Sequence, residues 1–454
     1  MADEEYIVKE NKMGVMPVPR LLFSMAVPIM ISMLVQALYN VVDSIFVARL
    51  SEDALTSVSL AFPMQNLMIA VGSGIGVGTN AMLSKKLGEK DYETASSAAV
   101  HGIMLSMIAY VLFAIFGIFF TRTFFEGQTD IPAIIDGGVD YLTTICVLSF
   151  GLFGQIIMER LLQSTGMTIY SMITQGTGAI INIILDPILI FGLAGAPKLG
   201  IRGAAVATVI GQMTATVLAI YFNITKNKEI SLSLKGFRPQ AGIIGVILYV
   251  GIPSIIMVAV TSITVFGMNR ILMQFTSTAA AVLGAYFKLQ SFIMMPVFGL
   301  NSAMIPIIAY NYGARRGERI FSTIKLSVIT AMVIMAIGIL ILHVFPAQLL
   351  GLFNASDHML AIGVPALKTI SLSFIFAGYC IVCSSVFQAF GKGILSMIMS
   401  LMRQLVVLLP AAWLLSKTGN VNNVWWAYPL AELMSVAVTT IFLVRIYKTI
   451  ISRL

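Results

Sequence analysis

Long apolar stretches recur along the whole chain, and short polar segments such as KKLGEKDYE (85–93) and ARRGER (314–319) separate them. Each stretch is long enough to cross a bilayer as a helix, which takes about 20 residues. The pattern therefore predicts an all-α integral membrane protein with twelve transmembrane helices. We expect these helices over residues 21–45, 54–84, 94–120, 132–158, 167–192, 199–224, 243–270, 279–310, 319–345, 358–385, 393–416 and 424–446.

The two halves of the sequence repeat each other at a constant spacing of 225 residues. Pro28 corresponds to Pro253 in this register, and Gly88 corresponds to Gly313. Each repeat holds half of the expected spans, an even number, so both copies enter the membrane in the same direction. This predicts two six-helix bundles related by a pseudo-two-fold axis along the membrane normal, as in many transporters. The expected units are a first lobe over residues 1–224, a cytoplasmic linker over 225–242 and a second lobe over 243–454.

The composition leaves little room for a soluble domain, because 58% of the residues are hydrophobic and 11% are charged. The formal net charge of +8 does not indicate nucleic acid as a partner, because the basic residues gather in short connections. Examples on one side of the membrane are Lys85, Lys86, Arg160, Arg315 and Arg316. Such connections normally face the cytoplasm. We therefore expect a multi-pass protein of the cell membrane with both termini in the cytoplasm.

Metal and cofactor chemistry is not expected from this sequence. The three cysteines lie inside apolar stretches, where they are expected to pack as small hydrophobic residues. Cys380 and Cys383 form a CxxC pair, but the sequence offers no second pair and no histidine beside it. We expect no metal site, no cofactor and no enzymatic motif.

Polar residues interrupt the first apolar stretch on one face. Gln36, Asn40 and Asp43 are spaced i, i+4 and i+7, which places them on one side of a helix. A carboxylate inside a membrane is costly and normally faces a protein interior or a water-filled cavity. We expect this face to line a cation pathway; the alternative is that Asp43 lies close enough to the interface to be solvated. Its repeat partner is Met268, so the two halves differ here.

A count along the spans at about 1.5 Å per residue places several polar side chains at one depth in the first lobe. The group consists of Asp43, Tyr141, Asn182, Asp186 and Thr208. Pro187 follows Asp186 and leaves the carbonyl of Ile183 without its helical hydrogen bond. We expect Pro187 and Pro28 to mark positions where the helices kink during a conformational change.

Several motifs resemble those of one transporter family. The run QALYNVVDSIFVARL (36–50) is similar to the first-helix signature of the MATE family, whose name stands for multidrug and toxic compound extrusion. Further motifs of the same kind are NIILDPILIFG (182–192), GIRGAAVAT (200–208), AYFKLQSF (285–292), PVFGLN (296–301) and YNYGARR (310–316). The likeness covers nearly all of the chain and is strongest to the DinF-like branch, which includes MepA-type bacterial extruders.

The resemblance implies a function and a site. Asp43, Asp186, Asn182, Tyr141 and Thr208 would bind the coupling ion, a proton or Na⁺, in the first lobe. The protein would export cationic amphiphilic compounds in exchange for that ion by alternating access, as a monomer in the bilayer. The second lobe has no acidic residue in spans seven and ten, so no cation site is expected there.

The substrate cavity is predicted from polar residues and from flexible thioethers, of which the chain has many among its 28 methionines. The expected lining residues are Gln36, Tyr39, Asn40, Phe62, Met64, Gln65, Met68 and Phe153.

A second interpretation is a flippase or exporter of anionic or lipid-linked metabolites in the same superfamily. Lys288, Lys368 and Arg403 favour it, because these basic residues interrupt apolar stretches of the second half. The other explanation of these three is that they snorkel, or pair with backbone carbonyls and with Glu432. The paired aspartates favour cationic cargo.

Overall fold

The computed structural model describes residues 10–233, 235, 237–353 and 355–454, and within these residues every regular element is a helix. The first half contains α1 (Lys12–Val15), α2 (Val18–Ala48), α3 (Glu52–Gly88), α4 (Tyr92–Phe119), α5 (Thr121–Glu126), α6 (Pro132–Val147), α7 (Phe150–Ser164), α8 (Thr168–Phe191) and α9 (Ile201–Thr225). The second half contains α10 (Ala241–Leu272), α11 (Ser277–Gly313), α12 (Gly317–Val344), α13 (Pro346–Gly351), α14 (Asp357–Ser371), α15 (Phe374–Ala389), α16 (Gly393–Leu401), α17 (Leu409–Ser416), α18 (Val421–Val424) and α19 (Ala427–Thr449).

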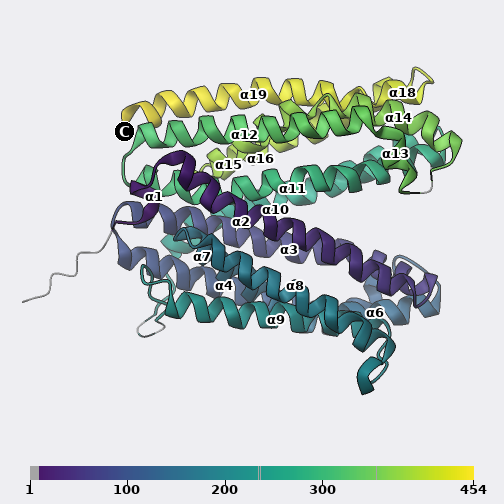
Figure 1. The fold of residues 1–454 in the computed structure, drawn as a ribbon, viewed down its shortest axis with the longest axis horizontal. Helices are drawn as coiled ribbons and strands as arrows, with labels where there is room; N and C mark the ends of the chain where they lie inside the picture. The colour runs from purple at the N-terminus through teal and green to yellow at the C-terminus, as the bar shows by residue number, and fades with distance from the viewer. Residues whose placement is uncertain (1–9, 234, 236, 354) are drawn as a thin grey trace, which may run out of the picture.

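The helices form two bundles, one from each half of the chain. In Figure 1 the first half, purple to teal, makes the lower bundle, and the second half, green to yellow, makes the upper one. In the described residues, ten single helices and two bent pairs are long and apolar enough to cross a membrane, which gives up to twelve spans. The predicted all-α membrane fold is confirmed. The exact lobe and linker bounds stay a prediction, and Leu234 and Gly236 of the expected linker lie outside the described residues.

The internal repeat is visible in the helix bounds. Moving α3 and α4 along the chain by 225 residues gives the bounds of α11 and α12. The same shift of α8 gives the range from Gly393 to Ser416, which α16, a π-helical segment (Met402–Leu408) and α17 cover together. Because helices of equal length recur at equal intervals, the two bundles are copies of one architecture.

Two of the predicted spans are broken, which the hydrophobic pattern did not indicate. The span expected at 132–158 consists of α6 and α7, bent by 44°, and the one at 358–385 consists of α14 and α15, bent by 49°. A serine hydroxyl lies at each break: Ser149 donates to the carbonyl of Cys146 (2.8 Å), and Ser373 donates to that of Ile370 (2.6 Å). Such local bonds compete with the helical ladder. Both spans also run further than expected, because α7 ends at Ser164 and α15 ends at Ala389.

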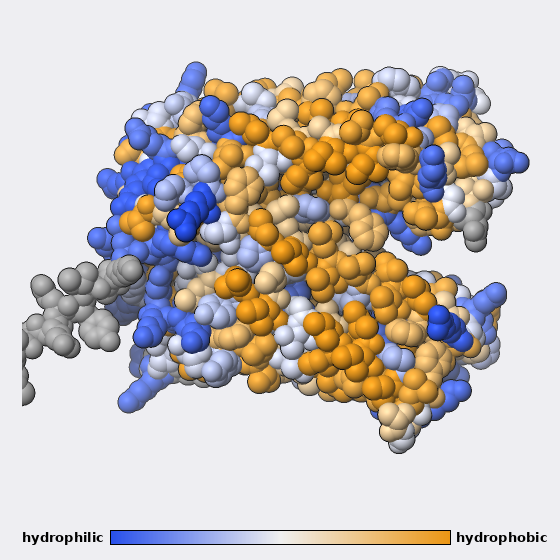
Figure 2. Space-filling view, in the orientation of Figure 1, coloured by the Kyte–Doolittle hydropathy of each residue, from blue (hydrophilic) through white to orange (hydrophobic). Residues whose placement is uncertain are grey.

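The surface has the pattern of a protein that lies in a bilayer. Figure 2 shows apolar residues around the middle of the molecule and polar residues at its two ends. Large apolar side chains are exposed on the helices, including Leu112 (62%), Phe119 (69%) and Phe266 (67%). The same view shows a cleft between the bundles, open at the end opposite the termini.

The bundles meet at the other end, where α3 and α11 touch through their backbones. A Cβ atom on Gly88 would overlap the carbonyl oxygen of Tyr310, and one on Gly313 would overlap that of Lys85. Lys85 and Gly88 correspond to Tyr310 and Gly313 in the repeat, so the crossing is symmetrical. The absence of a Cβ is what permits this approach.

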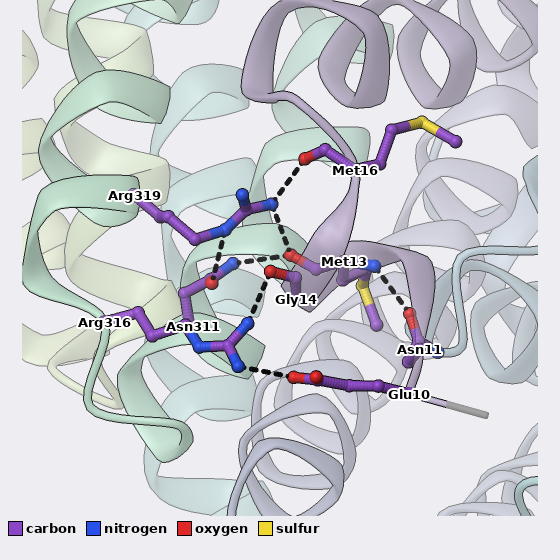
Figure 3. A network of polar contacts seen from close by, with 8 residues as sticks. All are labelled: Glu10, Asn11, Met13, Gly14, Met16, Asn311, Arg316 and Arg319. Carbon is purple, nitrogen blue, oxygen red and sulfur yellow. Dashed lines mark hydrogen bonds and ion pairs between the residues drawn. The ribbon is translucent and has the colours of Figure 1, made fainter. Parts of the chain in front are cut away.

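The segment before α2 lies across this closed end and binds to the second bundle (Figure 3). Arg319 donates hydrogen bonds to the carbonyl oxygens of Met13 (3.0 Å) and Met16 (2.7 Å). Arg316 pairs with Glu10 at 2.6 Å. These contacts fasten residues 10–16 to the start of α12.

The same segment also binds to the first bundle and to the connection that follows it. The Asn11 side-chain amide donates to the carbonyl of Thr165 (3.1 Å) and to the carboxylate of Glu229 (2.7 Å). Burial raises the pKa of the Glu229 carboxyl above its ordinary value, and the hydrogen bond from Asn11 opposes that shift. Residues 10–16 therefore connect both bundles at the end where they meet.

Substitution of the crossing glycine tests this packing. We expect Gly313→Ala to destabilise the protein by about 1–3 kcal/mol, because the added Cβ must push two helix backbones apart. The matched control is Gly284→Ala in the same helix, where a Cβ meets no atom within 4 Å. Thermal unfolding of the purified protein measures both. Equal unfolding midpoints for the two variants would show that the crossing is not tight.

Candidate substrate and ion site

Two acidic side chains from different helices meet inside the first bundle. The carboxyl group of Asp43 in α2 contacts that of Asp186 in α8. Asp186 is fully buried, with 0% of its surface exposed. Oδ1 of Asp43 and Oδ2 of Asp186 are buried and accept no hydrogen bond from a donor group in the described residues. The pair therefore has free acceptor oxygens that a proton or a cation would satisfy.

Asn182 extends this pair into a chain of contacts. It lies one turn before Asp186 in α8, and its amide nitrogen donates to Oδ1 of Asp186 (3.3 Å) and to the hydroxyl of Thr208 in α9 (3.3 Å). Its own Oδ1 is buried and accepts no hydrogen bond from the part of the chain that the structure describes. The structure thus brings together four of the five residues predicted to bind the coupling ion.

The fifth of these residues, Tyr141, has a different partner. Its side chain is 2% exposed, and its hydroxyl oxygen accepts a hydrogen bond from Gln65 of α3 (3.2 Å). Gln65 was predicted to line the substrate cavity. In the structure its bond to Tyr141 joins α3 to α6.

A cavity of about 470 Å³ lies beside the acid group. Asn182 and Thr208 line one part of it, and Glu159 and Arg160 of α7 line another. The lining also includes several neutral polar side chains: Gln36, Tyr39, Ser73, Gln155, Gln163, Gln175 and Gln212. Residues of the second bundle, Val258, Met295 and Phe298, complete the wall. The cavity therefore lies on the face of the first bundle that looks toward the second.

Two of the predicted lining residues, Gln36 and Tyr39, line this cavity. Gln36 accepts a hydrogen bond from Gln175 (3.0 Å) and contacts the Tyr39 hydroxyl. Asn40, by contrast, is exposed and does not line it. The inward face of α2 is formed by residues 36, 39 and 43. The predicted face was wrong at one position, because Tyr39 and not Asn40 points inward.

The other predicted lining residues lie elsewhere. Met68 and Phe153 are fully buried in the core of the bundle, each with 0% exposure. Phe62 is exposed on α3 (63%), whereas Met64 is half-buried. None of these four lines the cavity beside the acids.

The two prolines do not interrupt their helices in this structure. α2 continues through Pro28, which is buried, and α8 continues through Pro187. The hydroxyl of Ser32 donates to the carbonyl of Pro28 (3.0 Å). Their predicted part in gating stays a prediction.

Sequence reasoning missed Glu159 and Arg160 as cavity residues. The expected span ended at residue 158, and Arg160 was assigned to a cytoplasmic connection. Arg160 lies in a helix and not in a connection, because α7 continues to Ser164 and carries both side chains along the cavity wall. Its expected place on the cytoplasmic side stays a prediction. A Glu–Arg dipeptide directly after an apolar stretch was the available signal.

The basic residues of the second bundle have separate environments. Arg403 forms an ion pair with Glu432 of α19 at 3.1 Å, as one of the two explanations expected. It lies in the π-helical segment (Met402–Leu408), and both partners line a smaller cavity of about 370 Å³. Lys288 and Lys368 are exposed, and the Lys288 ammonium lies 5.8 Å from the ring centroid of Phe353.

Two repeated helical bundles, an apolar belt and a polar cavity between them define a multi-pass membrane transporter. The chain belongs to the MatE family, whose model matches residues 28–188 and again residues 253–414. The two matches start 225 residues apart, which is the repeat spacing found in the sequence and in the helix bounds.

Curated relatives agree with this assignment. The chain is 28% identical to the multidrug export protein MepA of Staphylococcus haemolyticus over 413 residues, which cover 90% of this chain and 89% of the relative. It is 26% identical to MepA of Staphylococcus aureus over 438 residues, covering 95% and 94%.

Solved structures share the fold. One is described as the outward-facing conformation of a multidrug resistance MATE family transporter and superposes with a TM-score of 0.92 at 24% identity, covering 98% of this chain and 99% of the other. A transporter of the MOP superfamily from Pyrococcus furiosus matches with a TM-score of 0.90 at 25% identity, covering 96% and 98%.

The ion pair of the second bundle allows a test of its structural role. We expect Glu432→Ala alone to destabilise the protein by about 3–5 kcal/mol, because Arg403 would be left without its partner in a buried site. The double variant Arg403→Leu with Glu432→Leu should unfold at a higher temperature than Glu432→Ala. A double variant that is less stable than the single one would contradict this assignment.

Proposed function

We propose that the protein exports cationic amphiphilic compounds across the cell membrane in exchange for protons. The observation that carries the proposal is the contact between Asp43 and Asp186, beside a cavity large enough for a drug-sized molecule. The relatives named multidrug export protein support this choice of cargo.

Repulsion between the two carboxylates makes the charge of the pair depend on proton binding. Two carboxylates in contact in a buried pocket cannot both ionise easily, so the pair retains one proton. The remaining negative charge attracts a cation in the adjoining cavity. A second proton removes that charge and weakens the hold on the cation.

The gradient then gives the cycle a direction. The bias of basic residues puts both termini in the cytoplasm, so the open cleft of this structure faces outward. Protons from outside neutralise the pair and release the substrate. After the bundles reorient, protons leave toward the cytoplasm, and the restored charge binds the next cation. The protein works as a monomer in this scheme, because one chain contains both bundles.

Sodium is the alternative coupling ion. The acceptor oxygens of Asp43, Asp186 and Asn182 that lack a donor, together with the Thr208 hydroxyl, are hard oxygen ligands. Na⁺ bound at the two acids would neutralise their negative charge as a second proton does, and would weaken substrate binding for the same reason. Export of anionic or lipid-linked cargo is less well supported, because Arg403 is paired with Glu432.

Transport assays test the role of the acids. In proteoliposomes with an imposed pH or sodium gradient, we expect Asp43→Asn and Asp186→Asn to reduce gradient-driven transport of ethidium by at least about tenfold, equivalent to 1.4 kcal/mol. The matched control is Asp140→Asn, which changes an exposed aspartate of α6 and should leave transport within about twofold. The proposal fails if Asp43→Asn transports ethidium at the wild-type rate. The gradient that drives wild-type transport identifies the ion.

A further inference from the structure

We infer that the second bundle binds an anionic phospholipid of the cytoplasmic leaflet, in a pocket between the start of α12 and the end of α19. The pocket has a volume of about 840 Å³, and its lining includes Arg315, Arg316, Arg319 and Tyr447. It lies at the closed end of the molecule, where Figure 1 shows the C-terminus and α1. The inference does not depend on the proposed export or on its coupling ion.

Basic residues gather around this pocket. The stretches 315–319 and 445–453 contain six basic side chains and one acidic side chain. An adjoining pocket of about 460 Å³ shares Arg315 and is also lined by Lys85 and Arg453. Figure 2 shows hydrophilic residues over this end of the upper bundle. A phosphate group is a suitable partner for such a cluster, because the guanidinium fork can donate to two of its oxygens at once.

Most of these basic side chains are available to a ligand. Arg316 is paired with Glu10, and Arg319 donates to two backbone carbonyl oxygens of the segment before α2. Within the part of the chain that the structure describes, no ion pair includes the remaining four, which are Arg315, Arg445, Lys448 and Arg453. All four are exposed. A phosphate group at this place would therefore meet several positive charges.

An aromatic pair continues the pocket toward the membrane. Phe321 of α12 and Tyr447 of α19 both line it, and their side chains are 50% and 45% exposed. Their rings meet edge to face, with centroids 5.9 Å apart. Both lie further along their helices toward the middle of the molecule than Arg315 and Arg453 do. Basic groups next to an exposed aromatic pair suit a ligand with an anionic head group and acyl chains.

Close packing holds the two sides of the pocket together. Gly317 is the first residue of α12, and the 3-10 helix Ile451–Arg453 follows α19. A Cβ on Gly317 would come within 2.9 Å of the carbonyl oxygen of Ile451. Because the two helix ends already touch, the pocket does not need to be assembled when a ligand binds, and this lowers the cost of binding.

The first bundle lacks this concentration of positive charge. In the repeat register, residues 90–94 and 220–228 correspond to 315–319 and 445–453. These stretches of the first bundle contain three basic side chains and two acidic ones. The bias of basic residues that orients a membrane protein applies to both bundles alike, so it does not account for the difference. A ligand held by the second bundle alone does account for it.

Lipid binding to the full-length protein tests the inference. Native mass spectrometry of the protein in detergent micelles gives its affinity for phosphatidylglycerol and for phosphatidylcholine with the same acyl chains. We expect the wild type to bind phosphatidylglycerol at least about tenfold more tightly. The double variant Arg315→Gln with Arg453→Gln should weaken phosphatidylglycerol binding by at least about tenfold and leave phosphatidylcholine within about twofold, because it removes two charges near the head group.

The matched control is Lys90→Gln with Lys228→Gln, which removes the same charge at the corresponding positions of the first bundle. Lys90 and Arg315 both have a left-handed backbone, with φ of 61° and 55°, so the two substitutions are alike in strain. The control should keep its phosphatidylglycerol affinity within about twofold of the wild type. Arg315→Lys with Arg453→Lys retains the charge and should retain most of the preference for phosphatidylglycerol.

The outcomes decide both the place and the ligand. Equal affinities of the wild type for the two lipids would overturn the inference, and so would equal losses in the Arg315–Arg453 variant and in its control. Glycerol 3-phosphate carries the phosphate without acyl chains, so a large excess of it should leave phosphatidylglycerol bound. Displacement of the lipid by glycerol 3-phosphate would show that the pocket takes a soluble phosphate, which would also overturn the inference.

Discussion

The contact between Asp43 and Asp186 is the interaction on which the rest of the account depends. It joins α2 to α8, and α2 also packs against α11 of the other bundle. Within that second contact, a Cβ on Gly299 of α11 would come within 2.8 Å of the backbone of Met30. A helix held closely on both sides responds to a change on either side. A change in the charge of the acids therefore changes the packing of α2, the helix that contacts both bundles.

The asymmetry of the two bundles gives each a separate role. The helix bounds of the two halves repeat closely, yet the first bundle carries two acids in contact, and a glutamate and an arginine that form no ion pair within the described residues line its cavity. In the second bundle Arg403 and Glu432 pair with each other. A neutralised pair holds helices together, whereas charges without partners invite an ion or a ligand. Chemistry is thus concentrated in one copy of a duplicated scaffold.

The membrane spans and the internal repeat could be predicted from the sequence, because hydrophobic runs indicate spans and a constant spacing of similar residues indicates a repeat. A count of depth was enough to bring Asp43, Asp186, Asn182 and Thr208 together. Side-chain direction was harder: Asn40 is exposed, since the inward face of α2 is centred nearer to Tyr39. The end of a span was harder still. The expected span ended at residue 158, directly before two adjacent charges, Glu159 and Arg160, and α7 in fact carries both of them along the cavity wall.

The most direct test of the central claim is a count of protons released when a cation binds. If a bound cation displaces the second proton and leaves the shared one in place, unbuffered wild-type protein in nanodiscs should release about one proton per ethidium bound at a mildly acid pH, where both acids are protonated. The double variant Asp43→Asn with Asp186→Asn should release none. Saturating ethidium binding to the wild type without proton release, in the presence and absence of sodium, would contradict the claim.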